Sequence, residues 1–255
     1  MSAPISPADP RTSLASASRV TFAVETRSEV QLADEALSVL LSLDSPDFDA
    51  FRLLRTKLKT LGDERPLRSF GVVSALPQEG TSSVALGLAL ALTQEHDRRV
   101  LLVETTLRAP ALARRLGLAV EPGLGEWLAS GGNRPVPLRR LEPWGLSVLA
   151  AGAGVPQSAV LVGSPSMAAL LTSARQQFDY VLLDCPPLET MADSAVLQDA
   201  LDGFLLVVRA RHATRDAIRR SLSRLKPGAV LGVVFNDRTE NRLRWLEQRR
   251  PRPTS

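Results

Sequence analysis

The sequence predicts an α/β fold, a doubly wound and mainly parallel sheet with helices on both faces. Two observations predict it. Six short runs rich in Val and Leu recur along the chain, and such continuous runs are typical of strands buried on both faces. Segments with helical periodicity fill most gaps between these runs, and this alternation gives a parallel sheet covered by helices. A length of 255 residues suits one large domain with tails.

The elements follow in order. Residues 1–28 are rich in Ser, Ala, Pro and Thr without periodicity, and they predict a disordered arm. The domain is expected over 29–237, starting with a helix at 47–61, and a basic tail over 238–255 follows it. The predicted strands are 69–75, 99–105, 146–152, 179–184, 203–209 and 229–235. The clearest predicted helices between them are 82–95, 164–177 and 213–226.

Composition and charge exclude several classes of protein. Cys185 is the only cysteine, so an internal disulfide is excluded, and a reducing compartment is expected. The longest apolar stretches, such as 84–92, fall short of the roughly 20 residues of a spanning helix. The three tryptophans do not alternate with basic residues as in a nucleic-acid platform, so no specific nucleic acid is expected. We therefore expect a cytoplasmic protein that reaches the membrane only through a partner.

The turn SALPQEGTSS (74–83) joins the first apolar run to a helix. In P-loop proteins such a turn wraps phosphate groups with backbone N–H groups and the positive end of the helix dipole. The usual pattern closes with Gly-Lys-Ser/Thr, whose lysine reaches the outer phosphates and whose hydroxyl binds Mg²⁺. Here Gly80 is followed by Thr81, Ser82 and Ser83, so a neutral threonine takes the place of the lysine.

Together with further segments in the same order, this turn resembles the cytoplasmic domain of bacterial protein-tyrosine kinases of polysaccharide export. That family shares the P-loop superfamily of the MinD and ParA ATPases, and the resemblance spans about residues 45–237. The helix DAFRLLRTKL (49–58) resembles the family's Glu-x-x-Arg-x-x-Arg helix, with Asp49, Arg52 and Arg55 in those places. The resemblance implies that this helix contacts a neighbouring subunit in a ring.

Two more segments carry the resemblance. RVLLVETTLRAPALARRLGL (99–118) resembles the second phosphate motif of the family, and FDYVLLDCPP (178–187) resembles its Walker B strand, with Asp184 in place. Asp193 and the strand-end Asn236 also match family positions. The resemblance implies a nucleotide site at Gly80, Thr81, Ser82, Ser83, Asp184 and Asn236, with Mg²⁺ held by Ser82 and Asp184.

The chain departs from the family at the residues that carry charge. Thr81 replaces the catalytic lysine, Gln78 replaces a loop glycine, and Glu104 and Thr106 stand where the second motif has two aspartates. Losing one charge-stabilising donor costs about 2.7–4 kcal/mol, or roughly 10²–10³ in rate. Glu104 is expected to reach a metal-bound water, whereas threonine cannot replace a carboxylate ligand.

Tyr180 is the only tyrosine, it is expected in a buried strand, and the C-terminal tail has none of the tyrosines that the family clusters there. ATP or ADP with Mg²⁺ is therefore expected to bind weakly, or not at all if the serines simply cap the helix.

Three functions follow from these residues and the resemblance. The first is a degenerate kinase-like regulator of exopolysaccharide export that acts with a membrane polysaccharide co-polymerase, and with a true kinase subunit or copies of itself. The second is an active ATP-dependent tyrosine kinase of the same pathway whose acceptor lies in another chain. The third is a MinD- or ParA-like positioning ATPase, which would carry a signature lysine where this chain has Leu76.

Overall fold

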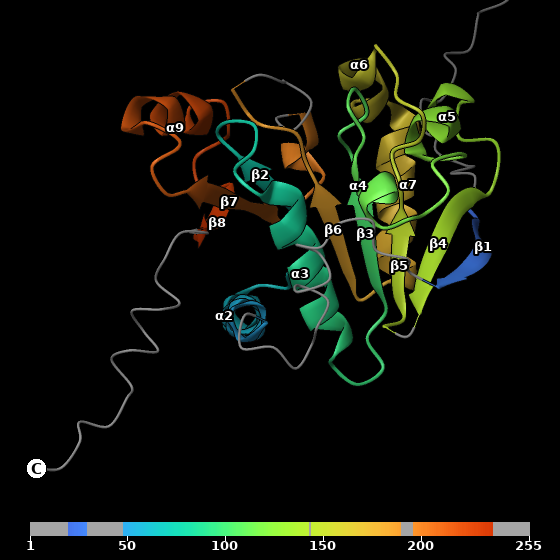
Figure 1. Ribbon diagram of the computed structural model, residues 1–255, viewed down its shortest axis with the longest axis horizontal. Helices are drawn as coiled ribbons and strands as arrows, with labels where there is room; N and C mark the ends of the chain where they lie inside the picture. Colours follow the sequence, from blue (N-terminus) through green and yellow to red (C-terminus); the bar gives the residue numbers. More distant parts are fainter. Residues whose placement is uncertain (1–19, 30–47, 143, 190–195, 237–255) are drawn as a thin grey trace, which may run out of the picture.

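The structure is a computed structural model that describes residues 20–29, 48–142, 144–189 and 196–236. Within these residues, one sheet has the strand order β1-β4-β5-β3-β6-β2-β7-β8 (Figure 1). Its strands are β1 (Phe22–Glu29), β2 (Ser69–Ser74), β3 (Val100–Glu104), β4 (Val136–Glu142), β5 (Leu146–Leu149), β6 (Tyr180–Asp184), β7 (Gly203–Arg209) and β8 (Val230–Asn236). The helices are α2 (Asp49–Glu64), α3 (Thr81–Thr93), α4 (Leu112–Arg115), α5 (Leu124–Ala129), α6 (Ser158–Val162), α7 (Pro165–Gln177) and α9 (Arg215–Leu222), with a short 3₁₀ turn at Leu197–Asp199.

The predicted doubly wound sheet is confirmed. The six strands expected from apolar runs are β2, β3, β5, β6, β7 and β8, and they all pair in parallel with their neighbours among themselves. Two further strands extend the sheet beyond β5: β4 runs antiparallel to β5, and β1 pairs in parallel with β4.

The disordered arm predicted over 1–28 is wrong for residues 22–28, because these belong to β1. The strand pairs Phe22 with Val136 and Glu29 with Glu142. A strand at the edge of a sheet need not be a continuous apolar run, and its partner here lies more than a hundred residues away in the sequence. Local periodicity therefore gave no sign of it. Residues 1–19 and 237–255 lie outside the described part of the chain.

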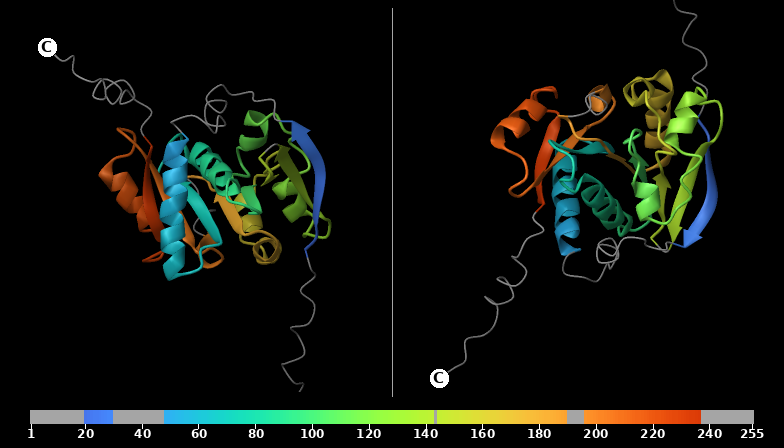
Figure 2. Two further views of the ribbon diagram at one scale, coloured as in Figure 1. Left: turned by 90° about the horizontal axis from the view of Figure 1, so that it is seen from below. Right: turned by 45° about the horizontal axis from the view of Figure 1, so that its top comes forward.

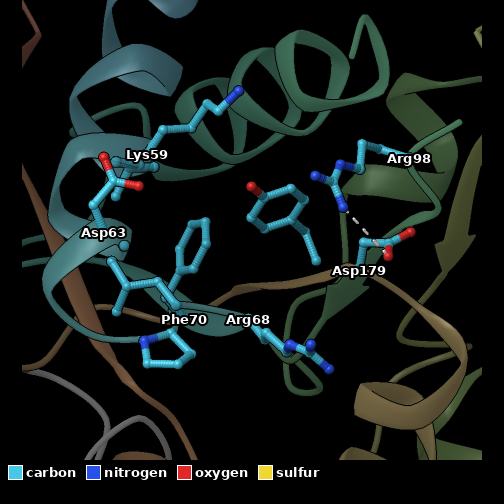
Figure 3. A pocket seen from close by; sticks show the side chains of 11 residues that line it. Lys59, Asp63, Arg68, Phe70, Arg98 and Asp179 are labelled. Atoms are coloured by element: carbon cyan, nitrogen blue, oxygen red, sulfur yellow. Dashed lines mark ion pairs between the residues drawn. The ribbon is translucent and has the colours of Figure 1, made fainter. Parts of the chain in front are cut away.

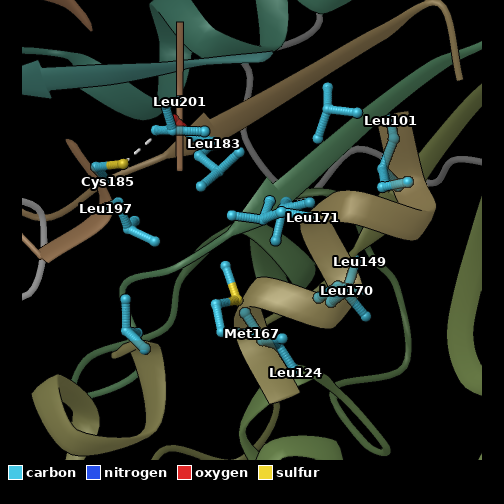
Figure 4. Close-up of a cluster of buried hydrophobic side chains, with 14 of the residues drawn as sticks. Leu101, Leu124, Leu149, Met167, Leu170, Leu171, Leu183, Cys185, Leu197 and Leu201 are labelled. Carbon is cyan, nitrogen blue, oxygen red and sulfur yellow. Dashed lines mark hydrogen bonds between the residues drawn. The ribbon is translucent and has the colours of Figure 1, made fainter. Parts of the chain in front are cut away.

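Helices cover both faces of the sheet, so alternate residues of each strand face two separate cores. In β3, Leu102 packs into the core under α2 and α3, whereas Leu101 and Val103 pack into the core that includes α7. Figure 4 shows the second core, in which Leu101, Leu149 and Leu183 from the strands meet Leu170 and Leu171 from α7.

α3 is buried along its length from Val84 to Leu92, because the sheet covers one side and α2 covers another (Figure 2). The two helices approach closely at Gly87, where an added Cβ would lie 2.5 Å from the ring of Phe51. This packing holds fixed the helix that begins at the predicted phosphate turn. In the described residues, no helix combines the length and the apolar character needed to cross a membrane.

Candidate functional site

The predicted site residues gather at the carboxyl ends of the parallel strands. β6 lies between β2 and β3, and Asp184 at its end pairs in register with Glu104 of β3 and with Val72 of β2. The turn that follows β2 therefore lies directly beside Asp184. In open α/β sheets, ligands bind in the crevice outside these strand ends.

The turn reaches α3 through Gly80, which has φ +91° and is the N-cap residue of the helix. A Cβ at this position would lie 2.1 Å from Nδ2 of Asn236, so only glycine fits. The Asn236 amide donates a hydrogen bond of 2.8 Å to the carbonyl oxygen of Glu79. Asn236, predicted to contact nucleotide, thus holds the turn in place from the end of β8.

Glu79 is a site residue that the sequence analysis missed. Its side chain is completely buried, and its two carboxylate oxygens accept hydrogen bonds from the backbone N–H groups of Leu76 (2.9 Å) and Arg209 (3.2 Å). The first bond closes the turn and the second ties it to the end of β7. The sequence could have pointed to Glu79, because a carboxylate next to the loop glycine needs hydrogen-bond donors if it is buried in the turn.

Gln78 stands where the family has a glycine, and its backbone has φ +63°. This left-handed conformation is sterically unfavourable for a residue with a Cβ, which explains the glycine in the family. The carbonyl oxygen of Gln78 accepts a hydrogen bond from Nη1 of Arg209 at 3.3 Å. The turn therefore has a left-handed residue at position 78 even though glutamine stands there instead of glycine. Arg209 of β7 binds the turn through both its backbone N–H and its side chain.

Asp184 and Ser82, the predicted metal ligands, lie together. Asp184 is 2% exposed, and among the described residues its Oδ1 atom has no hydrogen-bond partner. Burial raises the pKa of Asp184 to about 7; a hydrogen bond with the Ser82 hydroxyl lowers it, nearby Glu104 raises it and Arg115 lowers it. A buried carboxylate oxygen without a partner, beside a hydroxyl, is an oxygen donor set that fits Mg²⁺.

The Glu104 carboxylate, which is expected to reach a metal-bound water, is bound by backbone donors in this structure. Its Oε1 accepts hydrogen bonds from the backbone N–H groups of Ala111 (2.7 Å) and Leu112 (2.8 Å), and its Oε2 accepts one from Ala151 (3.0 Å). Three backbone donors therefore engage both carboxylate oxygens, in a side chain that is 1% exposed. Glu104 fixes the start of α4 and the segment after β5. Thr106, two residues further along the chain, is half-buried.

Arg115 brings a positive charge to the same site and was also missed by the sequence analysis. It is the last residue of α4, is half-buried, and its Nη2 donates a hydrogen bond of 3.3 Å to Oγ of Ser83. The pair of arginines at 114–115 gave no sign in the sequence of which one would turn inward. The site thus joins three segments: the turn, the end of β6 and the end of α4.

The predicted interface residues of α2 make contacts within the chain. Arg52 forms an ion pair of 2.8 Å with Asp49, and its Nε donates to Oε1 of Gln94 at 3.2 Å. Arg55 donates from Nη1 to the carbonyl oxygen of Ala91 at 2.8 Å, near the carboxyl end of α3. Both arginines therefore join α2 to α3, and a role in contacting another subunit stays a prediction.

Tyr180 is half-buried rather than buried, and it lines a surface pocket with Lys59, Asp63, Arg98 and Asp179 (Figure 3). This pocket lies at the start of β6, whereas Asp184 ends the same strand, so it is separate from the phosphate turn.

Cys185 adds no reactive group to the site, and Asp193 is not described. Burial raises the pKa of the Cys185 thiol to about 12, which leaves it as a packing group. Asp193 lies outside the described residues. No cluster of three or more His, Cys, Asp or Glu side chains suited to a metal ion occurs in the described ranges.

Similar sequences were found among characterised bacterial proteins, although no family model matches the chain. The putative tyrosine-protein kinase EpsB of Ralstonia solanacearum is 33% identical over 207 residues, which are 79% of this chain and 27% of that protein. The succinoglycan biosynthesis transport protein ExoP of Rhizobium meliloti is 34% identical over 182 residues, 69% of this chain and 23% of that protein. The chain thus spans about a quarter of the length of these two relatives. The tyrosine-protein kinase YwqD of Bacillus subtilis is 27% identical, with coverage of 74% and 80%.

Solved structures agree with the sequence comparison. The kinase domain of the Escherichia coli tyrosine kinase ETK superposes with a TM-score of 0.72 at 27% identity, over 79% of this chain and 82% of that one. The kinase domain of VpsO gives a TM-score of 0.67 at 28% identity, over 74% and 94%. A ParA family ATPase from Chlorobium tepidum shares the fold alone, at 23% identity and a TM-score of 0.55. By sequence and by fold, this chain is therefore similar to the kinase domains of the bacterial protein-tyrosine kinases, and it has a P-loop NTPase-like α/β fold.

Proposed function

We propose that the chain is a degenerate, kinase-like regulator of exopolysaccharide biosynthesis or export that binds Mg²⁺–nucleotide weakly and transfers phosphoryl groups very slowly or not at all. One observation carries this proposal: a neutral Thr81 occupies the lysine position beside the Ser82–Asp184 pair. The site has kept its metal-binding groups while losing the charge that acts on the transferring phosphate.

Retained binding is supported by the backbone. α3 is 13 residues long and starts at Thr81, so its free N–H groups and its dipole favour an anion at the turn. Glu79 and Asn236 hold the turn in shape without help from a ligand. Ser82 and Asp184 would hold Mg²⁺, which when bound neutralises phosphate charge and bridges phosphate oxygens.

Impaired catalysis is supported by three side chains. Phosphoryl transfer depends on positioning and on charge stabilisation at the transferring group. Thr81 supplies no charge there, Thr106 supplies no carboxylate, and the Glu104 carboxylate is engaged by backbone donors. These losses affect one charge network, so their effects on rate need not add. A loss of 10²–10³ from the lysine alone already leaves a slow enzyme.

The proposed partners are a membrane polysaccharide co-polymerase and a true kinase subunit or further copies of this chain, at the inner face of the cytoplasmic membrane. The similarity to a succinoglycan biosynthesis transport protein and to several tyrosine-protein kinases supports this setting. A second candidate is an active kinase of the same pathway. The Ser82–Asp184 pair favours it, because a metal site is retained, and its acceptor tyrosine would lie in another chain.

The test compares binding with turnover in one preparation. By titration calorimetry we expect the wild type to bind Mg²⁺–ATP with a Kd well above the micromolar range, and Asp184→Asn to weaken this binding further because a metal ligand is lost. In a phosphate-release assay and with a phosphotyrosine antibody, we expect no turnover above the Asp184→Asn control. Rapid hydrolysis, or phosphotyrosine on Tyr180 or on a partner, would favour the active kinase instead.

A further inference from the structure

The phosphate turn has a deficit of positive charge. Its helix starts with three neutral residues, Thr81, Ser82 and Ser83, and the buried carboxyl of Asp184 lies beside Ser82. Phosphate oxygens placed here would meet that carboxylate without a lysine to offset it. Helix N–H groups favour an anion by only about 0.3–1 kcal/mol at exposed sites. A nucleotide site of this kind needs another cation.

Two arginines contact the turn, from opposite sides. Arg209 lies at the end of β7 and donates to the carbonyl oxygen of Gln78, in the outer part of the turn before α3 begins. Arg115 lies at the end of α4 and donates to the hydroxyl of Ser83, in the first turn of α3. Only the second of these contacts lies on the helix start, where the free N–H groups are.

Arg115 is held there by the surrounding structure. Glu104 accepts hydrogen bonds from the N–H groups of Ala111 and Leu112, which fixes the start of α4. Leu112 and Leu116 are 1% and 0% exposed in the core beneath α3, which fixes its orientation. The guanidinium is also close enough to Asp184 to lower the pKa of that carboxyl. The Glu104 that replaces an aspartate of the second motif thus positions the helix that carries Arg115.

We propose that Arg115 supplies in cis the positive charge that the turn lacks at Thr81, and that it binds the phosphate groups of a nucleotide. This inference rests on the proposed nucleotide binding. A guanidinium presents a planar fork of donors that matches phosphate oxygens, and it stays charged at any physiological pH. Arg115 contacts the helix at Ser83, two residues beyond Thr81. Its charge therefore strengthens nucleotide binding, but it does not stand at the lysine position, where charge acts on the transferring phosphate. Slow turnover and retained binding are therefore compatible.

The test measures affinity, with a neighbouring arginine as control. Arg115→Gln removes the charge, Arg115→Lys keeps it but loses the fork, and Arg114→Gln alters an exposed arginine that donates to the carbonyl oxygen of Pro110. By calorimetry we expect Arg115→Gln to weaken Mg²⁺–ATP and tripolyphosphate binding by about tenfold to a hundredfold, as for a charged hydrogen bond. We expect a smaller loss for Arg115→Lys and none for Arg114→Gln. Adding Thr81→Lys to Arg115→Gln should return most of the affinity.

The outcomes separate this inference from the proposed function. If the wild type binds nucleotide and Arg115→Gln binds it equally well, Arg115 is a structural residue and the inference is wrong, while nucleotide binding stands. If the wild type binds neither probe, both fall. An equal loss in Arg114→Gln would also overturn the inference, because the effect would then belong to α4 as a whole. Thermal melts without ligand check that each variant folds. If Arg115→Gln does not fold, Arg115→Lys is the test, and an unchanged affinity in that variant would show that the guanidinium of Arg115 is not needed to bind phosphate.

Discussion

Several polar side chains of the site form hydrogen bonds with the protein's own backbone. Glu104 binds three backbone N–H groups, Glu79 binds two, and Asn236 binds the carbonyl oxygen of Glu79. Asp184 differs from them because one of its oxygens has no partner within the described residues. A buried carboxyl of this kind is more stable with a proton than without one.

Asp184 should make the stability of the ligand-free protein depend on pH. Its pKa is about 7 in the folded chain and near 3.8 when unfolded, so the folded state binds the extra proton between these values. The contribution of Asp184 to the free energy of unfolding is then fully present below about pH 4. It is lost as the pH rises to about 7, and the loss is on the order of 4 kcal/mol. Urea unfolding of wild type and Asp184→Asn at several pH values tests this. The variant should lose that slope, and two parallel curves would contradict the assignment.

The sequence identified Ser82 from the turn after the first apolar run and Asp184 from the resemblance of its strand to a Walker B strand, and the structure brings the two together. It could not identify Arg115, because which of two adjacent arginines turns inward depends on how Leu112 and Leu116 pack. The backbone contacts of Glu104 could not be predicted for a similar reason. The extra methylene allows the carboxylate to reach backbone donors, and those donors come from a loop conformation that no periodicity encodes.

Among the elements, α2 and α3 pack closely and are joined by hydrogen bonds. Phe51 of α2 lies against Gly87 of α3, and Arg55 of α2 binds the carbonyl oxygen of Ala91. The six parallel strands could be predicted because they read as continuous apolar runs, which are typical of strands covered on both faces. β8 departs from this pattern, because Val233 and Phe235 of this strand are 62% and 67% exposed. β1 and β4 could not be predicted, since they extend the sheet at its edge and include polar residues such as Arg139 and Arg140.

Two glycine-to-alanine substitutions should have opposite effects on stability. Gly87→Ala places a Cβ 2.5 Å from the ring of Phe51, so the ring or the helix that carries it must shift, at a cost of about 1–3 kcal/mol. Gly62→Ala in α2 meets no atom within 4 Å and should stabilise the protein by about 0.5–1 kcal/mol, because alanine favours a helix. Thermal or urea unfolding would measure both. Adding Phe51→Leu should relieve part of the Gly87→Ala loss, and an unchanged midpoint in Gly87→Ala would refute the close packing.

At the scale of the whole molecule, the prediction that α2 contacts a neighbouring subunit needs a test that does not disturb the fold. Because Arg52 and Arg55 bind α3, replacing them would disturb the fold as well as any interface. Leu53 lies on the same helix and is 59% exposed, so it is available to a neighbour. Burying a leucine contributes about 1.5–3 kcal/mol, which is roughly tenfold to a hundredfold in affinity.

We therefore expect Leu53→Asp to weaken self-association, or binding to a partner kinase, by about tenfold or more. Val160→Asp is the matched control, because Val160 is 71% exposed on α6 and lies outside the predicted interface. Light scattering after size exclusion gives the mass, and circular dichroism checks the fold. If both variants assemble like the wild type, the exposed face of α2 is merely solvated, and the ring prediction loses its physical support.

The two hydrogen bonds that hold the phosphate turn also set when it can form during synthesis. The Glu79 carboxylate accepts a hydrogen bond from the backbone N–H of Arg209, 130 residues later in the chain, and the Glu79 carbonyl oxygen accepts one from the side-chain amide of Asn236, 157 residues later. A ribosome that has made the turn must therefore add most of the remaining domain before either partner exists. Contacts between such distant segments form late, because loop closure must precede them. A nascent chain that ends before β7 would carry the complete turn sequence and still have no phosphate site.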